Sequence, residues 1–158
     1  MAEPLTVTAL CVAGGSGERL GAAVPKAFVQ VGGVTLLEHA LRPITAHPGI
    51  RDVVVVAPSA WLDKAAGYAP SALVVAGGAT RQDSVAAGMA ALADDVDAVL
   101  VHDVARPFVP AEVIDRVLAA LADGAGAVIP ALPVTDTIKR VSAAGTVTAT
   151  FTQAMGWL

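Results

Sequence analysis

Five short apolar runs, separated mostly by helix-like segments, constrain the fold of this chain more than any other feature. The runs are rich in Val and Ala and span Leu5–Val12, Val53–Ala57, Leu73–Ala76, Ala98–His102 and Ala125–Pro130. Apolar runs of this length that alternate with helices are typical of parallel strands buried on both faces. The sequence therefore predicts an α/β fold, in which a single Rossmann-like domain has a mostly parallel sheet with helices on both faces.

The segment after the fifth run has a different pattern. Residues 132–150 are rich in Thr and alternate polar with apolar residues around a turn at Ala144-Gly145, which predicts a β-hairpin arm near the C-terminus. A two-stranded hairpin has too little core to stand alone, so we expect it to lie on the domain or on a second subunit. The predicted organisation is a nucleotide-binding domain over 1–131, the arm over 132–150 and an irregular tail over 151–158.

Composition limits the classes of partner. A chain of 158 residues that is 55% hydrophobic and 15% charged can bury one sizeable core. A net charge of −4 provides no basic field, so we expect neither a nucleic acid nor a membrane as partner. The single cysteine, Cys11, cannot form an internal disulfide, and Met1–Pro4 has no basic leader pattern. These features predict a cytoplasmic protein whose cysteine is a buried structural thiol.

A glycine-rich loop with two cations, Arg19 and Lys26, follows the first apolar run. Glycines in Ala13–Gly17 let backbone N–H groups approach a phosphate closely, and ligands of parallel sheets bind beyond the carboxyl ends of the strands. Lys26 follows proline rather than glycine, which excludes a Walker loop, and Leu20 stands where a dinucleotide fingerprint needs its third glycine. We predict a phosphate loop of the nucleotidyltransferase type; a tight turn with two solvated cations is the alternative.

Polar residues follow two further strands. Gly77-Gly78 precedes Ser84, a pattern that can bring backbone and hydroxyl groups to a nucleotide base or can simply form a capped turn. Asp103 ends a hydrophobic strand and is a candidate Mg²⁺ ligand. Arg106 either binds a substrate phosphate or pairs with Asp103. His102 should face the opposite side of the strand from Asp103 and is interpreted as structural.

Taken together, these loops resemble the 2-C-methyl-D-erythritol 4-phosphate cytidylyltransferase family from about Leu5 to Arg140. The resemblance rests on Ala13-Gly14-Gly15 with Arg19 and Pro25-Lys26, on Gly77-Gly78 with Arg81 and Asp83-Ser84, on His102–Pro107 and on Pro133–Lys139. A related family that uses ribitol 5-phosphate shares most of these motifs.

The resemblance implies an enzyme of isoprenoid precursor biosynthesis. Such an enzyme transfers CMP from CTP to the sugar-alcohol phosphate, with Mg²⁺ as cofactor and pyrophosphate as the second product. It further implies a homodimer, in which the arm of one subunit reaches the substrate of the other. The implied site comprises Arg19 and Lys26 as catalytic residues, Ala13, Gly14, Gly15, Gly17, Gly78 and Ser84 for CTP, Asp103 for the metal, and Arg106 and Thr137 for the substrate phosphate.

Two departures from the family pattern keep other functions open. Gln153 stands where the family has an arginine that helps to position the substrate phosphate, and the family pattern continues beyond Leu158. We therefore expect either an incomplete sequence or a shortened form. The alternatives are a ribitol-5-phosphate cytidylyltransferase, a related nucleotidyltransferase for another acceptor or base, and an inactive CTP-binding form. An NAD-binding module is disfavoured by Leu20.

Overall fold

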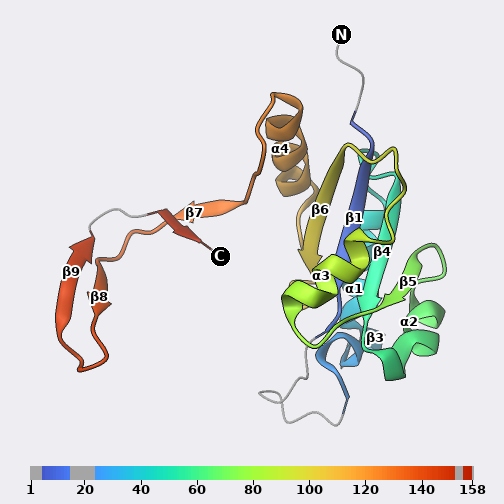
Figure 1. The fold of residues 1–158 in the computed structure, drawn as a ribbon, viewed down its shortest axis with the longest axis horizontal. Coiled ribbons are helices and arrows are strands. Elements are labelled where there is room, and N and C mark those ends of the chain that lie inside the picture. Colours follow the sequence, from blue (N-terminus) through green and yellow to red (C-terminus); the bar gives the residue numbers. More distant parts are fainter. Residues whose placement is uncertain (1–4, 15–23, 152–154, 158) are drawn as a thin grey trace.

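The fold is an α/β sheet with a projecting C-terminal arm (Figure 1). The computed structural model describes residues 5–14, 24–151 and 155–157, the last three by their backbone. In chain order the elements are β1 (Val7–Val12), η2 (Lys26–Phe28), β2 (Gln30–Val31), β3 (Val34–Thr35), α1 (Leu36–Thr45), β4 (Asp52–Ala57), η3 (Ser59–Trp61), α2 (Leu62–Tyr68), β5 (Leu73–Ala76), α3 (Arg81–Met89), β6 (Ala98–Asp103), α4 (Ala111–Ala122), β7 (Ala131–Pro133), β8 (Ile138–Val141), β9 (Val147–Phe151) and β10 (Met155–Trp157).

Four of the five apolar runs form one parallel sheet in the order β5-β4-β1-β6, which confirms the predicted fold class. All six residues of β1 are buried, as expected for a central strand covered on both faces. In the register, Val12 lies opposite Val56 on β4 and opposite Asp103 on β6. The strands therefore end together, and their following turns share one edge of the sheet.

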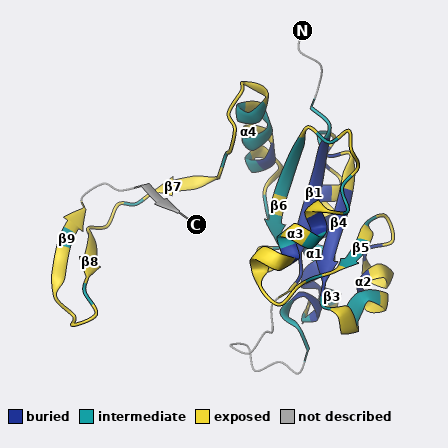
Figure 2. Cartoon of the chain, viewed as in Figure 1, coloured by how far each residue is buried: buried dark blue, intermediate teal, exposed yellow. Residues whose placement is uncertain are grey.

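Helices cover both faces of the sheet, also as predicted. On one face, α1, α2 and α4 contribute Leu37, Ala65 and Ile114 to a core that includes alternate residues of β1 and β4. On the other face, α3 packs Val85 against Leu10 and its neighbours. Figure 2 shows the resulting contrast between the buried central strands and the exposed outer helical surfaces.

Capping boxes fix where two of the helices begin. The Thr35 side chain accepts a hydrogen bond from the Glu38 N–H, while the Glu38 carboxylate accepts one from the Thr35 N–H, so that α1 begins at Leu36. Thr80 and Asp83 form the same reciprocal pair at the start of α3. The second box sets the angle at which α3 leaves the Gly77-Gly78 turn.

The fifth apolar run corrects the sequence prediction. Ala125–Pro130 is not a strand of the sheet; it leaves α4 through a turn in which Gly124 has a φ of +95° and continues in irregular conformation. Ile129 is 50% exposed, and Pro130 has no N–H group to donate to a strand ladder. The other four runs all became strands, of which β1 and most of β4 are buried while β5 and β6 are only partly so. Here the apolar run did not pair with β6.

The C-terminal arm consists of two antiparallel pairs. Strand β7 pairs with β10, and β8 pairs with β9 across a turn where Gly145 has a φ of +81°. This hairpin was predicted from the alternating Thr-rich pattern. Figure 1 shows β8 and β9 well away from the sheet, and every residue of β8 is exposed.

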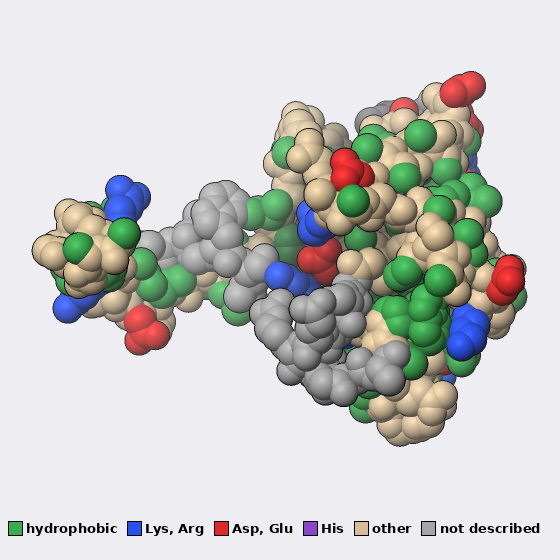
Figure 3. All heavy atoms as spheres, turned by 60° about the horizontal axis from the view of Figure 1, so that its bottom comes forward, with side chains coloured by type: hydrophobic (Ala, Val, Ile, Leu, Met, Phe, Trp, Pro, Cys, Tyr) green, Lys and Arg blue, Asp and Glu red, His purple; other side chains and the backbone are tan. Residues whose placement is uncertain are grey.

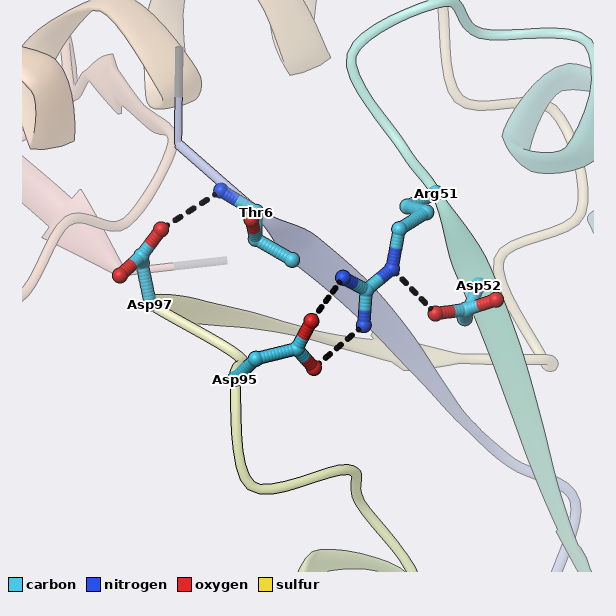
Figure 4. A network of polar contacts seen from close by, with 5 residues as sticks. All are labelled: Thr6, Arg51, Asp52, Asp95 and Asp97. Carbon is cyan, nitrogen blue, oxygen red and sulfur yellow. Dashed lines mark hydrogen bonds and ion pairs between the residues drawn. The ribbon is translucent and has the colours of Figure 1, made fainter. Parts of the chain in front are cut away.

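An ion-pair network joins the segments where the strands begin, at the end of the sheet opposite the glycine loops (Figure 4). Arg51 donates from Nη1 and Nη2 to the Asp95 carboxylate at 2.7 and 2.9 Å and from Nε to Asp52 at 2.6 Å. Asp97 accepts from the Thr6 N–H at 2.8 Å. The hydrogen bonds from Arg51 hold the pKa of Asp95 below its usual range. The network ties together the amino ends of β1, β4 and β6.

Candidate functional site

The turns after β1 and β6 meet at the carboxyl edge of the sheet. The Ala13 N–H donates to the Val56 carbonyl at 2.8 Å, and the Val104 N–H donates to the Val12 carbonyl at 3.2 Å. These bonds extend the strand ladders by one residue before the chain turns away. Gly14 follows on the exposed side of this edge.

Ser84 connects the first glycine turn to the second. Its side chain is buried, and its Oγ accepts a hydrogen bond from the Gly78 N–H at 3.2 Å. A Cβ on Gly77 would lie 2.8 Å from that Oγ, so a side chain there would require Ser84 to shift, whereas a Cβ on Gly14 would lie 3.8 Å from it. Predicted CTP-binding residues Gly14, Gly78 and Ser84 are therefore neighbours.

Asp103 ends β6 beside these turns and pairs with Arg81, the first residue of α3. The guanidinium donates from Nε and Nη2 to Asp103 Oδ1 at 3.2 and 2.9 Å. The carboxylate of Asp103 thus pairs with Arg81 and not with the Arg106 side chain, so the salt bridge considered for Arg106 does not form. Only the backbone N–H of Arg106 contacts Asp103, and it donates to the Asp103 carbonyl at 2.9 Å. Sequence reasoning gave Arg81 no role beyond its place in the Gly77-Gly78 motif.

The donor set at Asp103 fits a magnesium ion that arrives with its own oxygen ligands. The Asp103 side chain is 36% exposed, and the two side-chain hydrogen bonds described for it both go to Oδ1. In residues 5–14 and 24–151 there is no group of three acidic, His or Cys side chains that could enclose a metal. Mg²⁺ commonly uses one or two carboxylates together with phosphate oxygens, so one aspartate is sufficient at a nucleotide site.

Lys26 opens the 3₁₀ turn η2 directly after Pro25. The turn is closed by hydrogen bonds from the Phe28 N–H to the Pro25 carbonyl at 2.9 Å and from the Val29 N–H to the Lys26 carbonyl at 3.2 Å. The other predicted loop residues, Arg19, Gly15 and Gly17, lie outside the described residues. Figure 3 shows the end of the molecule at which the strands terminate, where acidic and basic side chains lie next to one another.

The two residues predicted for the substrate phosphate lie apart in one chain. Arg106 is exposed in the turn after β6, near Asp103. Thr137 directly precedes β8 and belongs to the arm, which Figure 1 shows far from the strand ends. Within a single chain, the structure therefore brings Arg106 to the glycine turns but does not bring Thr137 there.

Two titratable side chains of the central strands have shifted pKa values. Cys11 on β1 is buried, as predicted for a structural thiol, and burial raises its pKa to about 12. Desolvation by burial lowers the pKa of His102, and its buried Nε2 has no hydrogen-bond partner among the described residues. Both properties agree with a structural rather than a catalytic interpretation of His102.

A groove of about 830 Å³ runs along the outer edge of β6 and reaches Arg81 and His102 near the end of that strand. Its walls are mainly apolar and include Val99, Val101, Val113, Val117 and Ile129. Arg81 is the one cation among its lining residues, so the groove offers little to neutralise a triphosphate. The strand-end turns, with their backbone N–H groups, are the better candidate for an anionic ligand.

Similarity to known proteins agrees with this site. The family model for 2-C-methyl-D-erythritol 4-phosphate cytidylyltransferase (IspD) matches residues 7–157. The bifunctional enzyme IspD/IspF of Clavibacter michiganensis is 54% identical over 143 residues, covering 85% of this chain and 35% of that protein. The 2-C-methyl-D-erythritol 4-phosphate cytidylyltransferase of Rhodococcus jostii is 48% identical over 145 residues, covering 91% of this chain and 64% of the relative.

Solved structures show the same fold. A crystal structure of 4-diphosphocytidyl-2C-methyl-D-erythritol synthase superposes with a TM-score of 0.75 at 31% identity, covering 98% of this chain and 71% of that one. The corresponding protein of Anaerococcus prevotii gives a TM-score of 0.81 at 25% identity. The chain spans between about one third and two thirds of the length of the curated relatives named above. None of the helices described here has the length and apolar character required to cross a bilayer.

Proposed function

Because the chain belongs to the family of 2-C-methyl-D-erythritol 4-phosphate cytidylyltransferases (IspD), we propose that it transfers CMP from CTP to 2-C-methyl-D-erythritol 4-phosphate. The observation that carries this proposal is the convergence of three turns, after β1, β5 and β6, at one edge of the sheet. They place backbone N–H groups, a buried hydroxyl and a carboxylate beside one another. This combination can meet a triphosphate, a flat base and a divalent cation.

In the proposed complex, the triphosphate lies against the backbone of Ala13 and Gly14 and the Lys26 ammonium. Gly15, Gly17 and Arg19 continue the same loop in the sequence. The cytosine and ribose lie toward Gly78 and Ser84. The close approach that the two glycine turns permit supports this orientation, since a flat base needs a surface without side chains.

In the proposed reaction, a phosphate oxygen of the acceptor attacks the α-phosphorus of CTP while the bond to the pyrophosphate oxygen breaks on the opposite side. No covalent protein intermediate is needed, so catalysis consists of positioning and charge neutralisation. Lys26 and Arg19 stabilise the negative charge that develops on the phosphoryl oxygens. Arg106 binds the acceptor phosphate from the adjacent turn.

We also propose that Asp103 holds Mg²⁺ together with the nucleotide phosphates. The metal would neutralise phosphate charge and orient the triphosphate for in-line displacement. Arg81 keeps one carboxylate oxygen engaged, and this contact fixes the direction in which the carboxylate faces.

The arm supports a proposal about assembly. Its exposed apolar residues, together with the distance of Thr137 from the sheet, favour a homodimer in which Thr137 serves the acceptor site of the partner subunit. We propose a cytoplasmic location on the basis of the buried reduced Cys11.

The test is release of pyrophosphate by the purified chain with CTP, Mg²⁺ and 2-C-methyl-D-erythritol 4-phosphate. We expect release that depends on all three components. Parallel reactions replace the acceptor with ribitol 5-phosphate and CTP with GTP, and calorimetry measures CTP binding alone.

Each alternative function has its own signature in this experiment. Faster release with ribitol 5-phosphate would identify the other acceptor, and faster release with GTP would identify another base. Saturable CTP binding without release from any acceptor would identify an inactive CTP-binding form. Absence of CTP binding would contradict the proposed site altogether.

A further inference from the structure

We propose that Trp61 is a positioning residue for Lys26, acting through a ring stack with Phe28. This inference rests on the proposed function, because it assigns Lys26 to the CTP triphosphate. Lys26 and Phe28 are the first and last residues of η2, whereas Trp61 belongs to η3, more than thirty positions later in the chain. The stack is thus a tertiary contact that fixes a catalytic loop to the body of the domain.

The stack is close and joins a buried ring, Phe28, to a partly buried one, Trp61. The Phe28 and Trp61 ring centroids are 4.6 Å apart with an interplanar angle of 26°, and Tyr68 lies against Phe28 at 6.3 Å. Phe28 is 6% exposed and belongs to the main core. Such aromatic pairs stabilise a structure beyond the effect of their buried area, so the stack favours one arrangement of this short turn.

The contact is transmitted to Lys26 because η2 is a single closed turn. The hydrogen bonds that close it leave little freedom between the ring of Phe28 and the backbone of Lys26. On its far side, the Leu36 N–H donates to the Val29 carbonyl at 3.0 Å and joins the turn to α1. On its near side, Pro25 accepts the hydrogen bond from the Phe28 N–H. The ring stack adds a contact between η2 and η3, which these backbone hydrogen bonds do not provide.

Trp61 is itself held in place. Its backbone N–H donates to the Pro58 carbonyl at 2.8 Å, and the Lys64 ammonium lies 4.2 Å from the centroid of its indole ring. The cation supports the outer part of the ring in a geometry typical of a cation–π contact. A fixed Trp61 can therefore define where Phe28, and with it Lys26, is located.

The experiment compares the affinity of the full chain for CTP with its affinity for cytidine, which lacks phosphate. In Trp61→Ala, CTP should bind roughly tenfold more weakly, the size expected when a charged hydrogen bond is misplaced. Cytidine affinity should stay within about twofold, since Gly78 and Ser84 are untouched. Trp61→Phe should restore CTP affinity because it keeps a ring to stack.

A matched control separates positioning from general loss of packing. Leu118 on α4 is also half-buried against the main core, but it lies beside Gly49, at the end of the sheet where β4 begins. Leu118→Ala should lower the melting temperature as much as Trp61→Ala does, yet leave the ratio of CTP to cytidine affinity unchanged. If Trp61→Ala does not fold, Phe28→Leu tests the same stack from its other member.

The outcomes are distinct. Selective loss of CTP affinity in Trp61→Ala, restored by Trp61→Phe, supports the inference. Equal loss of CTP and cytidine affinity, or no loss of either, overturns it while leaving the proposed function intact. Failure of the wild-type chain to bind CTP at all overturns the proposed function and the inference together.

Discussion

Apolar side chains are buried in the centre of the sheet but exposed in the arm. In the sheet, β1 and most of β4 are buried on both faces beneath helices. In the β8–β9 hairpin, the apolar side chains of Ile138, Val141, Val147 and Phe151 are between 39% and 52% exposed. Both regions form regular strands, but helices cover the sheet, whereas no helix among the described residues covers the hairpin.

This difference in burial indicates that the sheet and the arm have different roles in the proposed enzyme. Turns at the edge of a rigid, buried sheet can be held in position before a ligand arrives, which suits the nucleotide. A solvent-exposed hairpin acquires a fixed position when it docks on another surface, which suits a contribution to the acceptor site of a partner. Changes in the sheet should therefore affect CTP first, and changes in the arm should affect assembly and acceptor first.

The largest expected effect comes from Lys26→Ala. Loss of a preorganised cation at a site of developing negative charge should reduce the rate of pyrophosphate release by roughly 10²–10³-fold. Lys139→Ala, which removes an exposed lysine from β8, is the matched control and should change the rate by less than about threefold. Melting curves of both variants should match the wild type. If both variants lost the same fraction of the rate of pyrophosphate release, Lys26 would have no special role at the nucleotide site.

Gly78→Ala should weaken CTP binding by about tenfold, because a misplaced binding group typically costs at least this factor. A Cβ at this position would lie 2.3 Å from the Cβ of Asp83, so the turn must shift. Gly67→Ala on α2 is the control: a Cβ there meets nothing within 4 Å, and alanine is the better helix former. Calorimetry measures both affinities, and unchanged affinity in Gly78→Ala would remove this turn from the CTP site.

In the arm, the double change Ile138→Ser and Val147→Ser should convert the proposed homodimer to monomer. Light scattering after size exclusion reports the mass, and we expect KM for the acceptor to rise while CTP affinity stays within about twofold. Val31→Ser provides the control, since Val31 is 50% exposed on β2 and outside the arm. A monomeric wild-type chain, or a variant that stays dimeric, would contradict the role given to the hairpin.

The smallest effect concerns pH. The pKa of His102 is lowered in the folded chain, chiefly by burial, from an ordinary value of 6.5. Below pH 6.5 the unfolded chain binds a proton that the folded chain does not, so the free energy of unfolding should decrease as pH falls from 6.5 toward the folded pKa. Denaturant unfolding of the wild type and His102→Gln measures this slope, which should be shallower in the variant. Identical slopes would show that burial of His102 does not affect the pH dependence of stability.

Local pattern was sufficient for most of the sheet. Four apolar runs became its strands. The run Ala125–Pro130 failed because apolar content reports a tendency to be buried, whereas pairing depends on which strand edge is within reach. No local pattern could show that β6 would be left with an unpaired outer edge.

The sequence was sufficient to predict which turns form the candidate site, but not which side chains pair within it. The positions of Gly78, Ser84 and Asp103 followed from the rule that parallel strands end at one edge. Which arginine reaches Asp103 depends on how α3 lies across the sheet, so Arg81 could not be distinguished from Arg106. The contact between Phe28 and Trp61 joins distant segments and has no signature in either one.

A crystal structure of the chain with CTP and Mg²⁺ would show whether the turns at the carboxyl edge of the sheet hold the nucleotide. We expect the triphosphate against Ala13, Gly14 and Lys26, with the base at Gly78 and the metal at Asp103. Nucleotide bound in the groove along β6, with these turns empty, would contradict this expectation.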